Sequence, residues 1–140
     1  MSCKKADIDI KPTKFSIMYG KRNGEYIEYY YVNGNIAIES YFINDKQNGM
    51  SCNYNFDGNL YSKAHFNDDK ENGERIEYYN IGQIQTKAYL IDDKKNGEVI
   101  NYKNDGQIHS KIYFIDNERT GEYMIYSLYG KLLKEIYYFS

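Results

Sequence analysis

Residues 57–78 read DGNLYSKAHFNDDKENGERIEY, a stretch in which two glycines separate runs of residues that favour β-strands. Gly58 follows Asp57 and Gly73 follows Asn72, and both dipeptides are typical of tight hairpin turns because glycine tolerates the positive φ angles that such turns require. Glycines at this spacing, with β-branched and aromatic neighbours, oppose a helix. The stretch therefore predicts strands joined by turns.

The same pattern recurs with a fixed period. One series of glycines is spaced by 24 residues, and a second series precedes it by nine residues, or by ten in the first unit. The two series are Gly34, Gly58, Gly82, Gly106 and Gly130, and Gly24, Gly49, Gly73, Gly97 and Gly121. A period of this length indicates a repeat protein, in which each unit packs mainly on its neighbours.

We predict an all-β fold: a single-layer, twisted antiparallel β-meander of about ten or eleven strands, built from five tandem β-hairpin repeats of about 24 residues. Units begin at residues 24, 49, 73, 97 and 121, a half-unit covers 15–23, and an N-terminal segment covers 1–14. One hairpin turn is expected at Asn33-Gly34 and its equivalents. The other is expected in longer stretches, three of which end at Asn48-Gly49, Asn72-Gly73 and Asn96-Gly97. An extra residue in the first unit, between Tyr30 and Asn33, predicts a bulge or a longer turn.

Strand periodicity sorts the side chains of the second strand of each unit onto two faces. Even offsets from the central glycine carry Ile or Leu, then mostly Ser or Thr, then mostly a small residue, then mostly Phe or Leu, and predict a packed face. Odd offsets carry a charged residue at the fifth position and an aromatic residue at the seventh, and predict a mixed face. The fifth positions form the charged row, Glu39, Lys63, Lys87, Lys111 and Glu135, and the seventh form the aromatic stripe, Tyr41, His65, Tyr89, Tyr113 and Tyr137. Members of the stripe should form one line about 10 Å apart, because two strands separate them.

The run from Asp57-Gly58 through Phe66 to Asn72-Gly73-Glu74 and Tyr78 resembles the MORN-type repeat. It is most similar to the variant of bacterial antitoxin-like proteins, whose unit reads D-G-x-L-x-x-E-x-x-Y, a short turn, and G-x-W-x-x-Y. The resemblance covers about 117 residues, 24–140. It departs from the family in the longer turn, where Asp69-Lys70 replaces a glycine, and after the second glycine, where Ile76 or its equivalents replace an aromatic residue. The resemblance implies a β-hairpin repeat fold and a protein-binding scaffold, with some antitoxin- or immunity-like and some phospholipid-linked members.

Charge and cysteine content narrow the classes of function. The chain has 18 basic and 20 acidic residues and a net charge of −2, which disfavours long-range attraction to nucleic acid or an anionic membrane. No stretch approaches the roughly 20 apolar residues of a transmembrane helix, and nothing near Met1 resembles a signal peptide, so a soluble cytoplasmic protein is expected. Cys3 and Cys52 stand in unrelated contexts, which predicts two free thiols in a reducing compartment.

Candidate catalytic groups have structural explanations. His65 and His109 fall at different offsets of their units, and neither has a Cys or Ser at a recognisable spacing. Cys52 with a histidine base would be a nucleophile, but its position is that of Ile76 and Ile100 in other units, so a small core residue on the packed face is favoured. We therefore expect that the protein has no enzymatic activity and binds no cofactor.

The candidate metal sites also have structural explanations. The acidic turns 68–73 and 92–97 hold clustered oxygens, yet they lack the alternating ligands of an EF-hand loop and carry lysines. Carboxylates recur directly after the turn glycine, at Glu25, Glu74, Glu98 and Glu122, and a recurring position indicates architecture rather than a catalytic pair. We expect solvated turns and no metal.

The functional hypothesis is a protein-binding surface on the mixed face, made of the aromatic stripe with Lys63, Lys87 and Lys111. Cross-strand packing that only stabilises the sheet is the structural alternative. A phospholipid or membrane-surface adaptor is the alternative function, and nucleic acid is not expected at a pI near 5.7. The apolar C-terminal residues 132–139 suggest a homodimer through the last repeat, because an open sheet edge recruits other strands.

Overall fold

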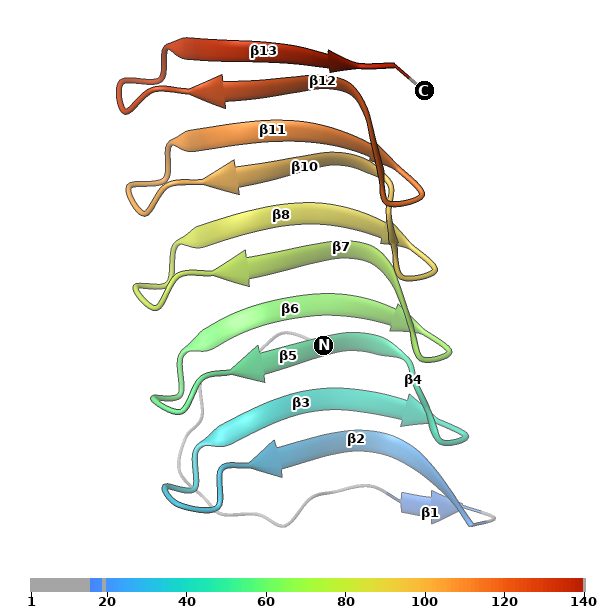
Figure 1. Ribbon diagram of the computed structural model, residues 1–140. Coiled ribbons are helices and arrows are strands. Elements are labelled where there is room, and N and C mark those ends of the chain that lie inside the picture. The colour runs from blue at the N-terminus through green and yellow to red at the C-terminus, as the bar shows by residue number, and fades with distance from the viewer. Residues whose placement is uncertain (1–15, 19, 140) are drawn as a thin grey trace.

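The computed structural model describes residues 16–18 and 20–139, and all regular structure in this part of the chain is β-strand (Figure 1). The first strands are β1 (Ser16–Met18), β2 (Lys21–Tyr29), β3 (Ile36–Ile43), β4 (Lys46–Gln47), β5 (Gly49–Tyr54), β6 (Leu60–Asn67) and β7 (Lys70–Tyr78). The remaining strands are β8 (Ile84–Ile91), β9 (Lys94–Lys95), β10 (Gly97–Tyr102), β11 (Ile108–Ile115), β12 (Glu118–Tyr126) and β13 (Leu132–Tyr138). The N-terminal segment 1–14 lies outside the described residues.

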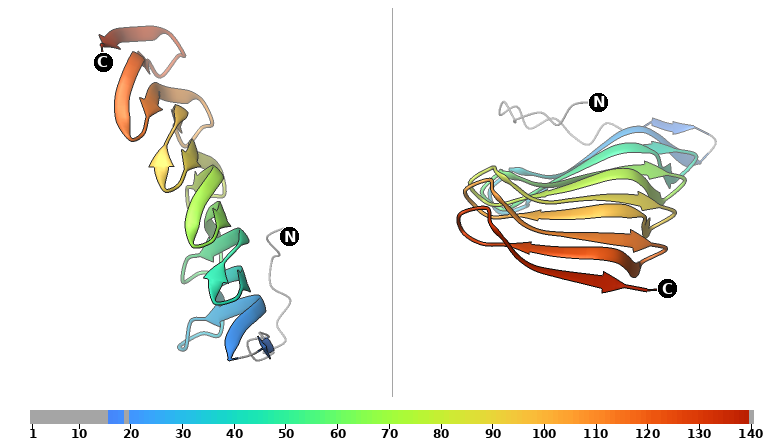
Figure 2. Two further views of the ribbon diagram at one scale, coloured as in Figure 1. Left: turned by 90° about the vertical axis from the view of Figure 1, so that its right-hand side faces the viewer. Right: turned by 90° about the horizontal axis from the view of Figure 1, so that it is seen from above.

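The strands form one sheet in chain order. Neighbours follow the path β1-β2-β3-β5-β6-β7-β8-β10-β11-β12-β13, with the two-residue strands β4 and β9 paired to β3 and β8. All pairings between the described strands are antiparallel. Two further views show a single curved layer, and no second layer formed by the described residues covers either face (Figure 2). The predicted all-β, single-layer antiparallel meander is confirmed.

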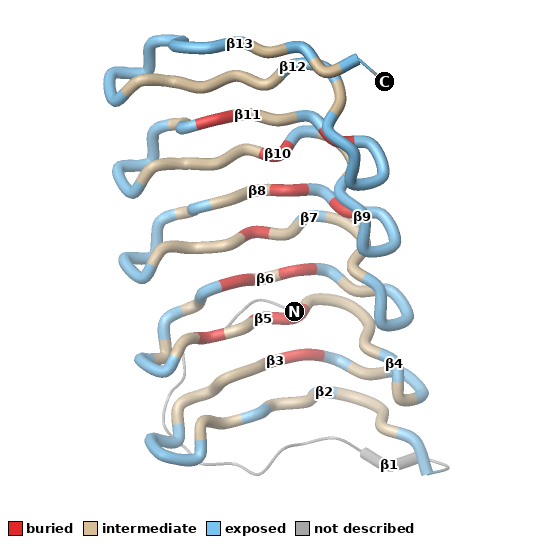
Figure 3. Tube along the Cα trace, viewed as in Figure 1, coloured by how far each residue is buried: buried red, intermediate tan, exposed pale blue. Residues whose placement is uncertain are grey.

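Most buried residues lie in the middle of the strands (Figure 3), and more of them are on the packed face than on the mixed face. Ala88, Leu90, Val99 and Phe114 form a hydrophobic cluster, with Ile112 packed against it. Small polar residues fill other positions of this face, as Ser40, Ser62 and Ser110 are at most 5% exposed. β12 and β13 contain no buried residue among those described. The even-offset prediction of a packed face is confirmed for the central strands.

The shorter turns are built as predicted. Gly58 N–H donates to Asn55 O over 2.9 Å, and Asn55 N–H donates to Asn59 O over 2.9 Å. Gly58 has a φ of 83°, a value that favours glycine. In the first unit the corresponding bond joins Tyr30 N–H to Asn35 O, so this turn is one residue longer. The extra residue therefore lengthens the turn.

The longer turns differ from the prediction. Asp68 and Asp69 both have positive φ, 51° and 71°, and the same pair of conformations recurs at 44–45, 92–93 and 116–117. Two consecutive residues with positive φ define a type I′ hairpin turn, and Asp and Asn tolerate this region better than other residues with a side chain. Asn72-Gly73 was expected to close the turn but lies within β7, near a register shift of the β6–β7 pair. That expectation was wrong, because the acidic pair makes the turn.

Side chains link successive turns along this edge. The second turn residue accepts a hydrogen bond from a backbone N–H of the preceding turn: Asp69 Oδ1 from Gln47 and Asp93 Oδ1 from Glu71, both over 2.7 Å. In return, Asp69 N–H donates to Gln47 O and Asp93 N–H donates to Glu71 O, both over 3.0 Å. The turn carboxylates therefore continue the pairing of the sheet where the chain bends.

Cys52 corrects two predictions. It is disulfide-bonded, so the prediction of two free thiols is wrong for this residue; the only other cysteine, Cys3, lies outside the described residues. Cys52 also stands opposite Glu39 and Lys63, which places it on the mixed face and not on the packed face. Alternation within one strand does not reveal which residue of the next strand lies opposite, and the register decides this.

No membrane-spanning helix occurs in the described part of the chain.

Candidate functional site on the mixed face

The charged row is one continuous line across the sheet. Register pairs place one residue from each main strand in this line, and charged residues alternate with apolar ones through most of it. From β2 to β13 the line reads Ile27, Glu39, Cys52, Lys63, Ile76, Lys87, Ile100, Lys111, Met124 and Glu135. Ile76 and Ile100 were expected on the packed face together with Cys52, and this expectation was wrong for the same reason as for Cys52.

The aromatic stripe lies beside the charged row on the same face. Each of its residues stands opposite a residue of the preceding strand: Tyr41 with Glu25, His65 with Met50, Tyr89 with Glu74, Tyr113 with Glu98, and Tyr137 with Glu122. The four tyrosines are between 39% and 52% exposed. The structure thus brings all eight predicted binding residues onto one face and leaves the aromatic rings accessible.

In the middle of the sheet, ion pairs connect lysines of the charged row with the glutamates that stand opposite the aromatic stripe. Lys87 Nζ lies 3.6 Å from Glu74 Oε1, and Lys111 Nζ lies 3.3 Å from Glu98 Oε1. Lys63 makes no such pair with a described residue, because Met50 stands where Glu74 and Glu98 stand in the next units. The spacing of the glutamates was visible in the sequence, but their pairing with the lysines needs the register.

The two rows together are acidic. Taken with the glutamates that stand opposite the aromatic stripe, they contain six glutamates, at 25, 39, 74, 98, 122 and 135, and three lysines, at 63, 87 and 111, so their formal net charge is −3. Two of the three lysines are already paired within the chain. The surface is therefore complementary to positive charge more than to phosphate groups.

Glu39 differs from the other glutamates because it is buried. It is 4% exposed, and its Oε2 accepts a hydrogen bond of 2.7 Å from the hydroxyl of Tyr54, which is 6% exposed. Burial raises the pKa of Tyr54, and the hydrogen bond to Glu39 raises it further. This pair is a structural element of the mixed face rather than an accessible charge.

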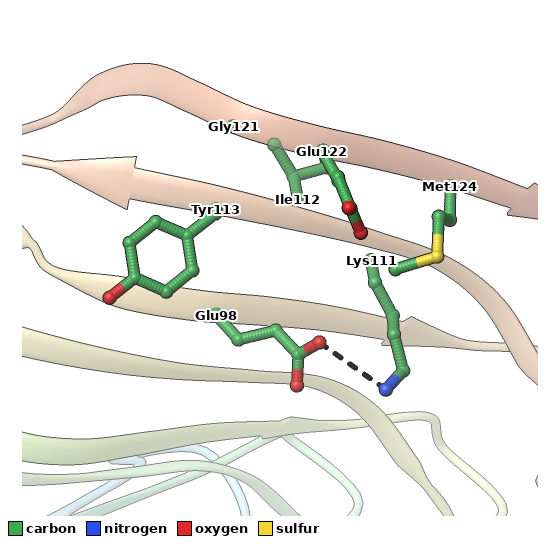
Figure 4. Close-up of a pocket in the computed structure, with 7 residues that line it drawn as sticks. All are labelled: Glu98, Lys111, Ile112, Tyr113, Gly121, Glu122 and Met124. Carbon is green, nitrogen blue, oxygen red and sulfur yellow. Dashed lines mark ion pairs between the residues drawn. The ribbon is translucent and has the colours of Figure 1, made fainter. Parts of the chain in front are cut away.

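A pocket opens on the mixed face between β10, β11 and β12 (Figure 4). Its volume is about 320 Å³. The ion pair of Glu98 and Lys111 and the ring of Tyr113 contribute to its lining. Across β11, Gly121, Glu122 and Met124 contribute from β12, together with Ile112. Figure 4 draws the seven lining residues and the ion pair between Glu98 and Lys111. The pocket joins an acidic group, an aromatic ring and apolar side chains.

The other candidate groups are not brought together. His65 lies in β6 and His109 in β11, with β7, β8 and β10 between them in the sheet. Among the described residues, no three His, Cys, Asp or Glu side chains are close enough to hold a metal ion. The carboxylates of Asp69 and Asp93 accept backbone hydrogen bonds within the turns. The aromatic stripe, the charged row and the pocket are thus the features that a ligand could use.

Comparison with protein-family models and with curated proteins found no match to this chain. The MORN resemblance accordingly rests on the sequence pattern.

Proposed function

We propose that this protein is a non-enzymatic scaffold of MORN-repeat type that binds a protein partner through its mixed face. The observation that carries the proposal is the alignment of four exposed tyrosines on one face of the sheet. Tyrosine is enriched in protein interfaces because its ring buries a large apolar area while its hydroxyl remains able to hydrogen-bond. An antitoxin- or immunity-like role is one form that such a scaffold takes.

The charges of the two rows support a protein partner over the phospholipid alternative. An anionic membrane attracts unpaired lysines, but Lys87 and Lys111 face Glu74 and Glu98 in ion pairs, and the rows carry more acid than base. The same arrangement disfavours nucleic acid, whose phosphates need cationic partners. A partner with basic groups on its surface would be complementary.

A pull-down from a lysate of the native host tests the proposal. The bait proteins are the unchanged chain, a Tyr89→Ala/Tyr113→Ala variant and a control variant, Tyr31→Ala/Tyr129→Ala. The control removes two tyrosines that are 102% and 95% exposed at the shorter turns, outside the stripe. We expect a partner that is lost with the stripe variant and retained with the control.

Loss of the partner in both variants, or in neither, would contradict the proposal, provided that circular dichroism shows an unchanged fold. Flotation with anionic liposomes tests the lipid alternative on the same proteins. Salt-sensitive association of the unchanged chain with vesicles would favour the membrane adaptor instead.

A further inference from the structure

Glu122, which lines the pocket between β10, β11 and β12, stands where the alternation of charge between neighbouring strands breaks. In the central units the glutamate that follows the turn glycine pairs with a lysine of the next strand, as Glu74 does with Lys87 and Glu98 with Lys111. Glu122 is the next glutamate in this series, since it stands opposite Tyr137 as Glu98 stands opposite Tyr113. The pattern predicts a lysine diagonal to Glu122 on β13.

That position is occupied by Glu135. It stands opposite Met124 just as Lys111 stands opposite Ile100. Among the described residues, neither Glu122 nor Glu135 forms an ion pair with a lysine or arginine. The exposed hydroxyl of Tyr137 hydrogen-bonds to Glu135, and this carboxylate raises the pKa of that tyrosine. Glu122 and Glu135 are therefore diagonal carboxylates at a place where the preceding units pair a glutamate with an ammonium group.

We propose that the pocket receives a lysine or arginine side chain of a protein partner, in the role that Lys87 and Lys111 fill within the chain. The inference rests on the proposed function, because it supplies the anchor of a protein interface. The occupant would contribute the positive charge that the last unit lacks. Lys111 cannot fill this role while it pairs with Glu98 at 3.3 Å.

The rest of the lining suits the same side chain. The ring of Tyr113 offers a π face to a cation, an interaction of about 0.5–1 kcal/mol at exposed sites. Met124 offers apolar contact to the methylene stem that lysine and arginine carry below their charged group. A volume of about 320 Å³ is at the lower limit of ligand pockets, which fits one inserted side chain better than a cofactor. An anionic ligand would face the carboxylate of Glu122.

Methyl-NMR with a defined probe tests the inference without a partner. The chain contains four methionines, so labelling their methyl groups gives few signals, among them those of Met124 in the pocket and Met50 outside it. The probe is Nα-acetyl-arginine methylamide, and the control ligand is the citrulline analogue, which has the same shape without the charge. We expect a saturable shift of the Met124 signal with the arginine probe only, and none for Met50.

Three variants separate the charge from the fold. Glu122→Gln should weaken probe binding up to about fivefold, because it removes the carboxylate that a cation contacts. Glu74→Gln is the matched control, since Glu74 holds the same place in a unit that has its own lysine, and it should leave probe binding unchanged. Glu135→Lys restores the pattern of the central units and should abolish probe binding without loss of stability.

Equal shifts with the citrulline analogue, or unchanged binding after Glu122→Gln, would overturn the inference. A Met124 signal that moves with protein concentration alone would assign the pocket to a second copy of the chain, and would also overturn it. If the probe fails while partner capture still requires Tyr89 and Tyr113, the pocket proposal falls and the proposed function stands. If the probe binds but partner capture does not require Tyr89 and Tyr113, the pocket proposal stands and the proposed function falls.

Discussion

The two faces of the sheet use neighbouring residues of the same strands for different purposes. In β11, Phe114 is 8% exposed and belongs to the hydrophobic cluster of the packed face, whereas Tyr113 is 46% exposed on the mixed face. The packed face combines small and apolar residues with the ion pairs of Arg75 to Glu71 and Glu77, while the mixed face carries alternating charges and accessible rings. The packed face thus holds the hydrophobic cluster, whereas the mixed face keeps its aromatic stripe accessible for binding although Cys52, Tyr54 and Ile76 are buried there.

The largest expected difference comes from this adjacent pair. Phe114→Ala should lower the free energy of unfolding by about 3–5 kcal/mol, because it removes a buried ring from the cluster. Tyr113→Ala should lower it by less than about 1 kcal/mol, because its ring is half exposed. Urea denaturation of both variants measures the difference. Equal losses would show that the mixed face is as important to folding as the packed face.

Tyr54 is the expected exception on the mixed face. Tyr54→Phe should cost about 1.5–3 kcal/mol of unfolding free energy, because it leaves the buried carboxylate of Glu39 without its 2.7 Å hydrogen bond. Tyr78→Phe is the matched control, since the residue that corresponds to Glu39 one unit further on is Lys63. Denaturation curves of the two variants should separate clearly, and a loss of similar size in the control would contradict this role of the pair.

The turn edge belongs to neither face and should give an intermediate effect. Asp93→Ala should cost about 2 kcal/mol, of which about 1 comes from the lost hydrogen bond to Glu71 N–H and about 1 from an alanine at a φ of 68°. Asp93→Gly should lose only the hydrogen bond. Asp93→Asn should be nearly neutral, because Asn117 already accepts the equivalent bond from Lys95 N–H over 2.7 Å. Thermal unfolding of the three variants tests this order.

Much of the fold was predictable because glycine spacing and strand alternation are local properties of the sequence. The aromatic stripe followed from the same alternation, since Tyr89 and Tyr113 hold equivalent offsets. The register between strands is not local, and this is why Cys52 was assigned to the wrong face. The type I′ turns were missed for another reason, because Asn72-Gly73 is a stronger turn signal than Asp68-Asp69, although the structure uses the latter. The pocket could not be predicted either, because it depends on how Glu98, Lys111 and Glu122 of three strands lie relative to one another.

Alkaline pH offers a way to observe the buried pair of the mixed face directly. The pKa of Tyr54 in the folded protein is raised above its ordinary value near 10, so the pair contributes stability that is fully present below pH 10 and is lost as the pH rises above it. The stability difference between the unchanged chain and Tyr54→Phe should therefore be constant from pH 7 to about 9 and shrink above pH 10. Urea denaturation across this range measures it. A difference that persists at high pH would contradict the hydrogen-bonded arrangement.

The smallest effect is expected from the ion pairs between the two rows. A double-mutant cycle of Glu74→Gln and Lys87→Met should give a coupling free energy of about 0.2–1 kcal/mol, because the side chains are 56% and 37% exposed and lie 3.6 Å apart. The cycle of Glu98 and Lys111 should give the larger value of the two, because that pair is closer and less exposed. Both couplings should weaken at 1 M salt, where the screening length is about 3 Å. A coupling free energy well above 1 kcal/mol would mean that the ion pairs are needed for the stability of the sheet. A small coupling free energy means that little stability is lost when either ion pair opens, so the side chains are free to rearrange when a charged partner binds.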